Sequence, residues 1–290
     1  MSEMVVVIHA GAASLSDDLR AHEADVREAL AAALGAAAAA LEDGQDAVAA
    51  VRCAVIEMES FPLFNAGLGS ALCADGSVEM SAALMRGSDR AAGAVAAVSH
   101  TRHPILAAQA LLDAEQVLLI GEHADAYAAA RGLEQWEPEM FITERQRRRL
   151  REHLALIEHG TVGAVCLDAA GALAAATSTG GLRGQPPGRV GDSPLIGAGT
   201  WADEHVAVSC TGQGEAFIRA GAARFLGALV EAGAAVDAAA LVVLEEVRRC
   251  GGSGGLIAVD ARGQVAMPFS SEAMPRGMWR AGEGAVVEVM

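Results

Sequence analysis

Short apolar runs along the chain are separated by longer stretches rich in Ala, Leu and Glu. The apolar runs predict buried strands at residues 4–8, 93–98, 117–120, 161–167, 172–179, 206–209, 255–259 and 264–267. The longer stretches predict helices at residues 21–41, 46–58, 104–113, 214–231 and 236–249. Turn residues such as Asp75-Gly76 indicate hairpins. Because strands come in antiparallel pairs and helices in blocks, the pattern predicts an α+β fold rather than βαβ alternation.

One segment, residues 132–160, interrupts this pattern because its apolar residues are sparse. It contains the basic run Arg145-Gln146-Arg147-Arg148-Arg149. Since acidic residues surround this run, an arm that binds nucleic acid is the weaker interpretation. We expect an exposed helix and a linker in this segment.

The composition predicts a folded chain with a sizeable core. Hydrophobic residues make up 52% and charged residues 20% of the 290 residues, whereas a disordered chain is poorer in apolar residues and richer in charge. Aromatic residues are only 3% and Gly occurs 33 times, so the core must rely on small side chains. The length suits one large domain or two small ones.

The charged residues exclude several classes of enzyme. The 21 positive side chains are all Arg, because the sequence contains no Lys. A P-loop, a pyridoxal-phosphate enzyme and a protein kinase each need a Lys. The net charge of −16 repels polyanions, so we expect no nucleic-acid partner.

Cysteine usage and the first residues bear on the cellular compartment. The 5 Cys are widely spaced and form no Cys-x-x-Cys pair, which argues against disulfides and zinc and favours a reducing compartment. The N-terminus lacks the basic region and long apolar core of a secretory signal. No apolar run is long enough to cross a membrane without a charge or a break. We expect a cytoplasmic protein with no membrane partner.

Three motifs have weak functional interpretations. Residues 251–255 (GGSGG) match the serine nucleophile elbow, but a helix is expected before them and a strand after them, the reverse of that motif. Residues 197–202 (GAGTWA) are similar to a dinucleotide-binding loop but open no obvious helix. For His100 and His103, which precede Pro104, a surface turn is the expected role and a metal site the alternative.

The most informative segment is 159–165 (HGTVGAV), at the start of a predicted buried strand. Gly160 permits a strained backbone next to Thr161. If the Gly160–Thr161 bond is cut, Thr161 gains a free α-amine with a pKa of about 8. That amine can act as the base for the hydroxyl of the same residue, which is the N-terminal threonine form of an activated nucleophile. An ordinary strand threonine is the alternative.

Polar loops after later strands supply further candidates. Arg189 and Asp192 lie close together in a Gly- and Pro-rich loop. A guanidinium beside a carboxylate can hold both ends of a zwitterionic amino acid, and a surface salt bridge is the alternative. Thr211 and Gly212 offer a hydroxyl and a backbone N–H at a strand-to-helix junction, which suits either an oxyanion hole or a helix N-cap.

Together these segments resemble the plant-type L-asparaginase/isoaspartyl peptidase family of N-terminal nucleophile hydrolases. The matching segments run along nearly the whole chain in the order of the family: 62–67 (PLFNAG), 93–96 (GAVA), 159–165 (HGTVGAV), 174–181 (AAATSTGG), 187–194 (PGRVGDSP), 209–212 (SCTG) and 251–255 (GGSGG).

The resemblance implies one domain, residues 1–290, with the four-layer αββα sandwich of the N-terminal nucleophile hydrolases. It implies self-cleavage into an α chain, 1–160, which ends in a linker at about 132–160, and a β chain, 161–290. It also implies a homodimer of cleaved αβ units and chemistry without a cofactor. A structural sodium ion would bind to a loop through the carbonyl groups of Glu59, Phe61, Phe64, Ala66 and Leu68.

The resemblance also implies a role for each site residue. Thr161 would be the nucleophile with its amine as the base, and Thr179 would assist cleavage or orientation. Thr211 and the Gly212 N–H would form the oxyanion hole, and Asn65 would lie near the scissile group. Arg189 would bind the α-carboxylate of the substrate, and Asp192 and the Gly214 carbonyl would bind its α-ammonium.

The implied small-molecule substrate is a β-aspartyl (isoaspartyl) dipeptide or L-asparagine. Thr161 would form a β-aspartyl ester, and water would then release aspartate. Glycosylasparaginases and taspase-like endopeptidases fit less well, since they carry an Asp before the threonine. One alternative is a family member that does not process itself and acts as a binding or scaffold protein. Another is a hydrolase of this class with a shifted amide substrate.

Several positions depart from the usual pattern of the family, among them Ser270 and Ser271, which stand where Asn and Thr are usual. Ala10 stands where a Gly is usual, Ser81 and Arg86 stand where acidic residues are usual, and Gln213 stands where a small residue is common. Ala10 could restrict the backbone during self-cleavage. The loss of two acidic residues could change the leaving-group preference, and Arg86 would favour an acidic leaving residue if it faces the cleft.

Overall fold

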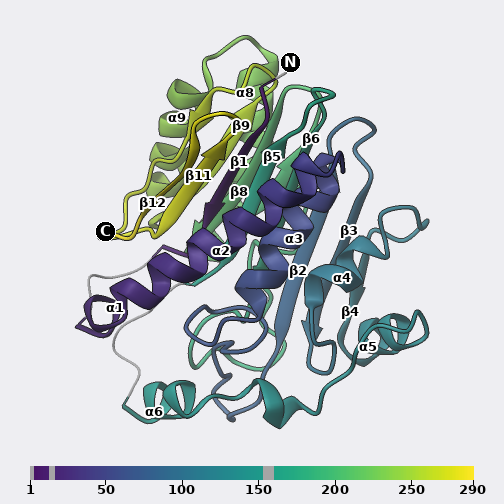
Figure 1. Cartoon of the computed structure of the whole chain (residues 1–290). Coiled ribbons are helices and arrows are strands. Elements are labelled where there is room, and N and C mark those ends of the chain that lie inside the picture. Colours follow the sequence, from purple (N-terminus) through teal and green to yellow (C-terminus); the bar gives the residue numbers. More distant parts are fainter. Residues whose placement is uncertain (1–2, 13–16, 153–159) are drawn as a thin grey trace.

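Two β-sheets pack against each other in the centre of the molecule, and helices cover their outer faces (Figure 1). The structure is a computed structural model that describes residues 3–12, 17–152 and 160–290. Neighbouring strands are antiparallel throughout both described sheets except for one parallel pair, β3–β4. The α+β class predicted from the sequence is therefore confirmed.

The larger sheet contains eight described strands in the order β12-β11-β1-β5-β6-β2-β3-β4. Their bounds are Val5–His9 (β1), Met80–Arg86 (β2), Ala92–Val98 (β3), Leu118–Ile120 (β4), Val162–Leu167 (β5), Leu173–Thr179 (β6), Arg276–Arg280 (β11) and Gly284–Glu288 (β12). The smaller sheet has the order β10-β9-β8-β7. Its strands are Thr200–Ala202 (β7), Val206–Gly212 (β8), Gly254–Asp260 (β9) and Val265–Ala266 (β10).

Each sheet has its own set of helices. The larger sheet is covered by α2 (Glu23–Glu42), α3 (Ala47–Glu59), α4 (Pro104–Gln109) and α5 (Gly121–Ala129). The smaller sheet is covered by α7 (Gly214–Ala220), α8 (Ala222–Glu231) and α9 (Val236–Arg249). The remaining helical elements are α1 (Asp17–Ala21), the 3-10 helix η1 (Pro138–Phe141) and α6 (Glu144–Glu152). No described helix combines the length and the apolar character that a membrane span needs.

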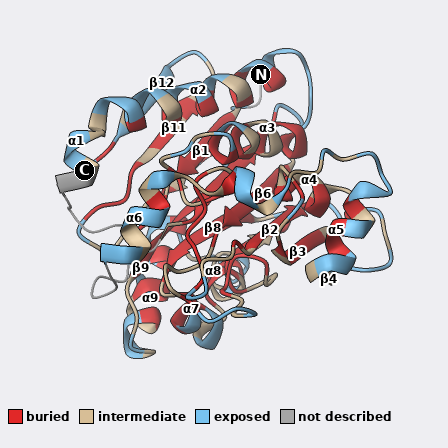
Figure 2. Ribbon diagram, turned by 90° about the horizontal axis from the view of Figure 1, so that it is seen from below, coloured by how far each residue is buried: buried red, intermediate tan, exposed pale blue. Residues whose placement is uncertain are grey.

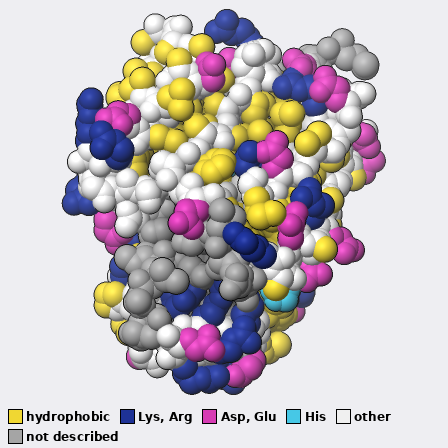
Figure 3. Space-filling view, turned by 90° about the vertical axis from the view of Figure 1, so that its left-hand side faces the viewer, with side chains coloured by type: hydrophobic (Ala, Val, Ile, Leu, Met, Phe, Trp, Pro, Cys, Tyr) yellow, Lys and Arg dark blue, Asp and Glu magenta, His cyan; other side chains and the backbone are white. Residues whose placement is uncertain are grey.

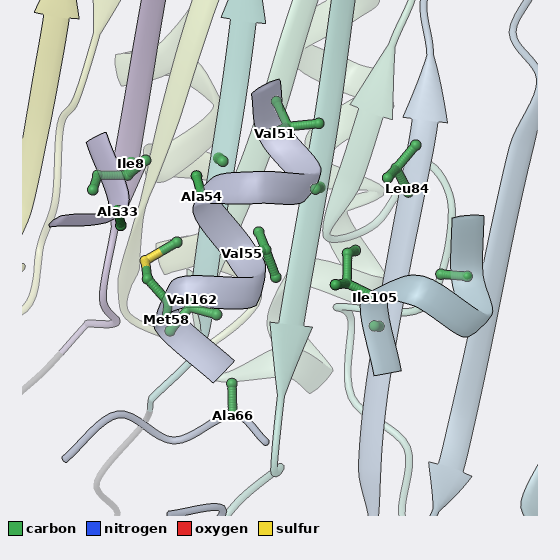
Figure 4. Close-up of a cluster of buried hydrophobic side chains, with 14 of the residues drawn as sticks. Ile8, Ala33, Val51, Ala54, Val55, Met58, Ala66, Leu84, Ile105 and Val162 are labelled. Atoms are coloured by element: carbon green, nitrogen blue, oxygen red, sulfur yellow. The ribbon is translucent and has the colours of Figure 1, made fainter. Parts of the chain in front are cut away.

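Alternation along the strands divides the core. Successive strand residues face opposite sides of a sheet. In β6, Ala174 and Ala176 pack toward the helices, whereas Leu173 and Ala175 pack toward the smaller sheet. The central strands and the inner sides of the helices are buried, whereas the edge strands β4 and β12 are largely exposed (Figure 2). In the helix-facing cluster, Val55 and Met58 of α3 lie above the larger sheet (Figure 4).

Small residues bring the helices close to the sheet. A Cβ atom at Gly93 of β3 would lie only 2.0 Å from the carbonyl oxygen of Ala108 in α4. Ala50 and Ala54 of α3 are fully buried in the same helix-facing cluster. These contacts agree with the expectation of a core built on small side chains.

The described elements differ from the predicted ones in two ways. The helix predicted at 214–231 is divided into α7 and α8, because Gly221 between them has a left-handed φ of 57°. The prediction also lacks α1, α5, η1, β2, β7 and the hairpin of β11 and β12. The sequence of β2, MSAALMR, is rich in helix-forming residues, and its pairing with β3 and β6 makes it a strand.

The segment 132–160 is only partly an exposed helix and linker. In α6, Arg151 forms an ion pair with Glu144 at 2.8 Å. Basic and acidic side chains are interspersed on the face of the molecule shown in Figure 3. In contrast, Phe141 of η1 is fully buried and its ring centroid lies 5.4 Å from that of Trp136. This stretch is therefore anchored in the core. Residues 153–159, which include His159 of the HGTVGAV motif, lie outside the described residues.

Candidate active site

Three threonines lie at strand ends on one edge of the two sheets. Thr161 directly precedes β5, Thr179 ends β6, and Thr211 lies near the end of β8. Val162 is paired with Ser178, so the antiparallel register places Thr161 beside Thr179. Thr161, Thr179 and Thr211 are 6%, 4% and 0% exposed. Their hydroxyl groups are therefore largely shielded from bulk water.

The Gly160–Thr161 peptide bond lies within this group. The Gly160 carbonyl oxygen accepts hydrogen bonds from Asn65 Nδ2 at 2.7 Å and from Thr179 Oγ1 at 2.9 Å. Thr161 Oγ1 donates to Thr179 Oγ1 at 3.3 Å. Two donors on one carbonyl oxygen stabilise the negative charge that develops there when a nucleophile attacks the carbonyl carbon.

The loop that carries Asn65 fixes the orientation of its side chain. Asn65 Oδ1 accepts from the backbone N–H of Ala71 at 2.6 Å, and Nδ2 also donates to the Gly181 carbonyl at 2.7 Å. A Cβ atom at Gly160 would lie 2.6 Å from Cβ of Asn65. The close approach of Asn65 therefore requires glycine immediately before Thr161.

The first loop also contacts the Gly160–Thr161 bond. Gly11 has a φ of +104°, and a Cβ atom there would lie 2.9 Å from Gly160 Cα and 3.0 Å from Thr161 N. Ala10 is not among the described non-glycine residues with positive φ. The departure at Ala10 thus falls on a position with ordinary backbone geometry, and the glycine that the geometry requires, Gly11, is present.

Arg189 and Asp192 line the same pocket as Thr161. The predicted site residues in its lining are Gly160, Thr161, Thr179, Arg189, Asp192 and Gly212. Burial raises the pKa of Asp192 to about 7, although nearby Arg189 lowers it. A Cβ atom at Gly214 would lie 2.8 Å from Asp192 Oδ1 and 3.0 Å from Arg189 Nη2. The absence of a side chain at Gly214 therefore makes room for the guanidinium and the carboxyl group.

Glu215, which the sequence analysis did not single out, orients Arg189. Its Oε1 accepts from Arg189 Nε and its Oε2 from Arg189 Nη2, both at 2.9 Å. These two bonds occupy one side of the planar guanidinium. Nη1, which donates to Gln185 Oε1 at 3.4 Å, and the second hydrogen of Nη2 form its other side. This side still has donors with which it can bind a further carboxylate through two bonds.

Gly212 and Thr211 have different surroundings. Gly212 lines the pocket with a φ of +145°, and a Cβ atom there would lie 2.4 Å from the Ser253 carbonyl oxygen. Thr211 Oγ1 accepts from the backbone N–H of Ala12 at 2.9 Å, which ties the first loop to β8. Of the two, the structure therefore places Gly212 in the pocket and Thr211 beside it.

The other departures from the family pattern lie in distinct places. Ser81 is paired with Thr179 across β2 and β6, and its Oγ accepts from Ala97 N at 3.3 Å. Arg86 lies at the far end of β2, about 17 Å along the strand, where it binds Asp89 and Asp113 at 2.8 and 3.0 Å. Arg86 therefore does not face the cleft, and the leaving-group role considered for it is wrong.

Gln213 also has a structural partner. Its Oε1 accepts from the backbone N–H of Ser253 at 3.0 Å, and its own N–H donates to the Ser253 carbonyl at 3.0 Å. These bonds hold the GGSGG segment against the end of β8. As predicted, that segment follows a helix, α9, and leads into a strand, β9.

The loop predicted to bind sodium folds back on Glu59. The Glu59 carbonyl accepts from Leu68 N at 2.8 Å, and the Phe61 carbonyl accepts from Phe64 N at 3.1 Å. Each of these carbonyl oxygens keeps a second lone pair, and oxygen atoms are the ligands of hard cations. The sodium site on this loop stays a prediction. Among the side chains of the described residues, no group of three or more His, Cys, Asp or Glu could hold a metal ion.

The two histidines considered for a metal site contact carboxyl groups. His103 Nδ1 lies 3.2 Å from Glu59 Oε2, and His100 Nδ1 lies 3.6 Å from Asp125 Oδ2. Glu59 also accepts from Ser178 Oγ at 2.6 Å, and burial raises its pKa. The side chain of His103 is only 12% exposed, so His103 does not lie on a surface turn.

This architecture defines the class of protein: a mixed α+β enzyme with a buried threonine site. Comparisons with known proteins identify its family. A sequence model described as asparaginase matches residues 2–158 and 155–288. An isoaspartyl peptidase of Escherichia coli K12 is 44% identical over 98% of this chain and 95% of its own. An isoaspartyl peptidase of Salmonella typhimurium is 44% identical over 98% of this chain and 97% of its own.

A mammalian relative is similar over nearly the same range. An isoaspartyl peptidase/L-asparaginase of Rattus norvegicus is 41% identical over 94% of this chain and 85% of its own. The chain belongs to the asparaginase family, and the resemblance read from its motifs is confirmed.

Four residues around the site were missed as functional candidates: His9, Thr177, Ser209 and Glu215. Thr177 and Ser209 lie two positions before Thr179 and Thr211 in predicted strands. Period-two alternation would have placed them on the same sheet face as the catalytic candidates. No comparable signal marks Glu215, because its pairing with Arg189 joins a helix to a distant loop.

Proposed function

We propose that this chain is a self-activating amidohydrolase that cleaves β-aspartyl dipeptides and L-asparagine and releases aspartate. The family and the names of the relatives support the substrate class. The observation that carries the mechanism is the Gly160 carbonyl, held by Asn65 and Thr179 next to the Thr161 hydroxyl.

Activation begins with attack of Thr161 Oγ1 on the Gly160 carbonyl carbon. The hydrogen bonds from Thr161 to Thr179 and from Thr179 to the carbonyl oxygen provide a path for the hydroxyl proton. As the tetrahedral intermediate collapses, the nitrogen takes up the proton that the hydroxyl lost, and the C–N bond breaks. An ester remains on Thr161, next to its free amine. Water then hydrolyses the ester, so that Gly160 ends the α chain and Thr161 begins the β chain.

Turnover uses the same hydroxyl with a new base. The free α-amine of Thr161, with a pKa of about 8, accepts the proton of Oγ1 as Oγ1 attacks the side-chain carbonyl of the substrate. Thr211 and the Gly212 N–H stabilise the oxyanion. The amine returns the proton to the leaving ammonia or amino acid, and a β-aspartyl ester remains on Thr161. Water attacks this ester and releases aspartate.

Charges in the pocket select the aspartyl unit. The side of the Arg189 guanidinium that faces away from Glu215 binds the α-carboxylate in a bidentate manner. Asp192, in its ionised form, binds the α-ammonium together with the Gly214 carbonyl. Because Asp192 is buried, its attraction for the ammonium is poorly screened. Asn65 stays near the scissile group.

The same assignment covers the molecule as a whole. The order of packing, helices on a sheet, sheet on sheet, then helices again, supports the four-layer αββα sandwich of N-terminal nucleophile hydrolases. We assign residues 1–290 to one domain that cleaves into chains 1–160 and 161–290. We further propose a homodimer of cleaved units, a cytoplasmic location and a structural sodium ion on the loop from Glu59 to Leu68. The reaction uses a hydroxyl, an amine and water, and needs no cofactor.

The intact mass of the purified protein over several days at 37 °C tests activation. We expect two chains that meet at Gly160–Thr161 in the wild type and in Thr161→Ser, which keeps a hydroxyl, and one full-length chain in Thr161→Ala. The cleaved protein should release aspartate from β-aspartyl dipeptides and, more slowly, from L-asparagine. A wild-type chain of constant full mass would contradict self-activation and would support a binding or scaffold role. Cleavage without aspartate release would indicate a different amide substrate.

A further inference from the structure

A second row of polar side chains lies directly behind the candidate catalytic row. His9, Thr177, Thr200 and Ser209 are all 0% exposed. Thr177 precedes Thr179 by two positions on β6, and Ser209 precedes Thr211 by two positions on β8. Because strand residues two apart share a face, this second row faces the same space between the sheets as the catalytic row.

The strand register aligns the members of this row. Gly163 of β5 is paired with His9 of β1 on one side and with Thr177 of β6 on the other. In the smaller sheet, Thr200 of β7 is paired with Ser209 of β8. The row therefore has one half in each sheet, and its hydrogen bonds cross the space between them.

These side chains form a continuous chain of hydrogen bonds. His9 Nε2 lies 3.1 Å from Ser209 Oγ, Ser209 Oγ lies 2.7 Å from Thr177 Oγ1, and Thr200 Oγ1 donates to Thr177 Oγ1 at 2.7 Å. Thr200 Oγ1 also lies 3.0 Å from the carbonyl oxygen of Ser193, the residue after Asp192. The chain thus begins on β1, beside the nucleophile strand, and reaches the loop of Asp192.

Gly163 of the HGTVGAV motif makes room for this chain. A Cβ atom at Gly163 would lie 2.1 Å from Ser209 Oγ and 2.4 Å from His9 Nε2. Gly163 is not among the described glycines with positive φ, so backbone conformation does not explain it. The missing side chain is explained by the hydrogen bond between His9 and Ser209, which passes through the space where a Cβ atom would lie.

The next row along the same strands is apolar. Val7, Val165, Ala175 and Ala207 lie two positions further from the site and belong to the cluster between the sheets. The fold can therefore fill this space with apolar side chains. Four buried polar side chains cost desolvation energy that the apolar row avoids, and they must be hydrogen-bonded to one another to be tolerated.

We propose that the chain of His9, Ser209, Thr177 and Thr200 is a positioning network that sets the separation of the nucleophile strands, β5 and β6, from the oxyanion strand, β8. This inference rests on the proposed function. The network touches no reacting atom and acts through Thr161, Thr179 and Gly212. Burial lowers the pKa of His9 to about 3, so the ring stays neutral and keeps the network uncharged at neutral pH.

The test is a pair of variants at one position. Thr177→Val removes the hydroxyl and keeps the shape, whereas Thr177→Ser keeps the hydroxyl and loses only a methyl group. We expect Thr177→Val to slow self-cleavage and to lower kcat by on the order of tenfold or more, with KM nearly unchanged. Thr177→Ser should remain within about threefold of the wild type. Thermal unfolding of each variant reports any loss of fold.

A control in the apolar row separates positioning from general stability. Val165→Ala should lower the unfolding temperature while kcat stays within about twofold. Equal kcat values for Thr177→Val and Thr177→Ser, or a drop in kcat for Val165→Ala as large as that for Thr177→Val, would overturn the proposal. If Thr177→Val does not fold, Ser209→Ala provides the same comparison against the wild type.

A double-mutant cycle tests whether the hydroxyls act as one chain. Because Thr177 and Ser209 share a hydrogen bond, the combined Thr177→Val and Ser209→Ala variant should lose little more activity than the worse single variant. Multiplicative losses would show independent effects and contradict a network. In all of these experiments a wild type that neither cleaves itself nor hydrolyses substrate would refute the proposed function. An active wild type with unaffected variants would refute the network alone.

Discussion

The two faces of the larger sheet differ in polarity, although the same strands form both faces. The face toward α2, α3 and α4 is lined with apolar side chains along its length, apart from the cluster of Glu59, Ser178 and His103. The face toward the smaller sheet is apolar at Val7 and Val165 but becomes polar toward the site. One face therefore serves mainly stability, whereas the other divides stability and chemistry between its two ends.

The difference shows why the site lies at a sheet edge. Polar side chains between two sheets must bind one another, because water cannot reach them. In the second row, hydrogen bonds across the sheets meet this need for His9 Nε2 and the three hydroxyl groups. In the catalytic row, Thr179 already binds Gly160, while the nearby Arg189 keeps donors on Nη1 and Nη2 beyond its bonds to Glu215 and Gln185. The polarity that would be costly in the centre becomes useful where the pocket opens.

The largest effect should come from a methyl group next to the scissile bond. Gly11→Ala places a Cβ atom 2.9 Å from Gly160 Cα at a φ of +104°. We expect self-cleavage to slow by about 100-fold or more, because a displacement of about 1 Å can cost that much. Intact mass against time measures the rate. Ala10→Gly is the matched control and should cleave at nearly the wild-type rate, and similar rates for the two variants would contradict the argument.

The helix-facing side should respond in stability and not in chemistry. Met58 is fully buried in α3, and Met58→Ala should cost about 2–5 kcal/mol in free energy of unfolding. Denaturant titration measures this loss, and kcat at a temperature where the variant is folded should stay near the wild-type value. Met140, which is 53% exposed, is the control, and Met140→Ala should change stability by no more than about 0.5 kcal/mol. A large loss of kcat in Met58→Ala would contradict the conclusion that the helix-facing side serves mainly stability.

Substrate binding should weaken at acidic pH because of Asp192. Burial raises the pKa of Asp192 to about 7. Since the ionised form binds the α-ammonium, KM should rise by about tenfold for each pH unit below that pKa. The pH dependence of kcat should instead reflect the protonation of the Thr161 amine. Steady-state kinetics from pH 5 to pH 9 separate the two. A KM that is constant across this range would show that Asp192 does not bind the ammonium.

The raised pKa of Asp192 also makes the stability of the fold depend on pH. Substrate binding needs the ionised carboxylate, whereas stability is higher with the protonated carboxyl group. The pKa of Asp192 is higher in the folded state than in the unfolded chain, so the folded state binds the proton more tightly. The resulting stabilisation is present below the ordinary value of 3.8 and is lost as the pH rises through about 7. Asp192→Asn should therefore unfold at a higher temperature than the wild type at pH 8, with a smaller difference at pH 5. An equal difference at both pH values would contradict the burial argument.

The smallest effect should come from Glu215. Removing its charge in Glu215→Gln leaves Arg189 less firmly oriented, and we expect KM to rise by about threefold to tenfold with kcat little changed. Exposed Glu231, which pairs with Arg224 at 3.0 Å, offers Glu231→Gln as the control. A fall in KM for Glu215→Gln would show that Glu215 competes with the substrate carboxylate for Arg189 rather than orienting it.

Much of the fold could be predicted from the sequence, and the features that the prediction missed have a common cause. The runs at Val5–His9, Val162–Leu167 and Gly254–Asp260 are apolar enough to identify strands. By contrast, β2 has the composition of a helix, and its strand conformation depends on neighbours from distant parts of the chain. Phe141 shows the same limit, because the polar residues around it conceal a side chain that is fully buried.

For the site, the sequence alone singled out Thr161, Thr179, Arg189, Asp192 and Gly212, because they stand in motifs that are readable without coordinates, but it did not single out Glu215. Tertiary structure decided what those residues contact. The bond from Asn65 to Gly160, the pairing of Arg189 with Glu215, the distance of Arg86 from the pocket and the row that joins His9 to Ser209 all depend on strand register and sheet packing. The physical reason is separation along the chain: local sequence sets the conformation of each strand, but only the packing of distant strands sets which side chains meet.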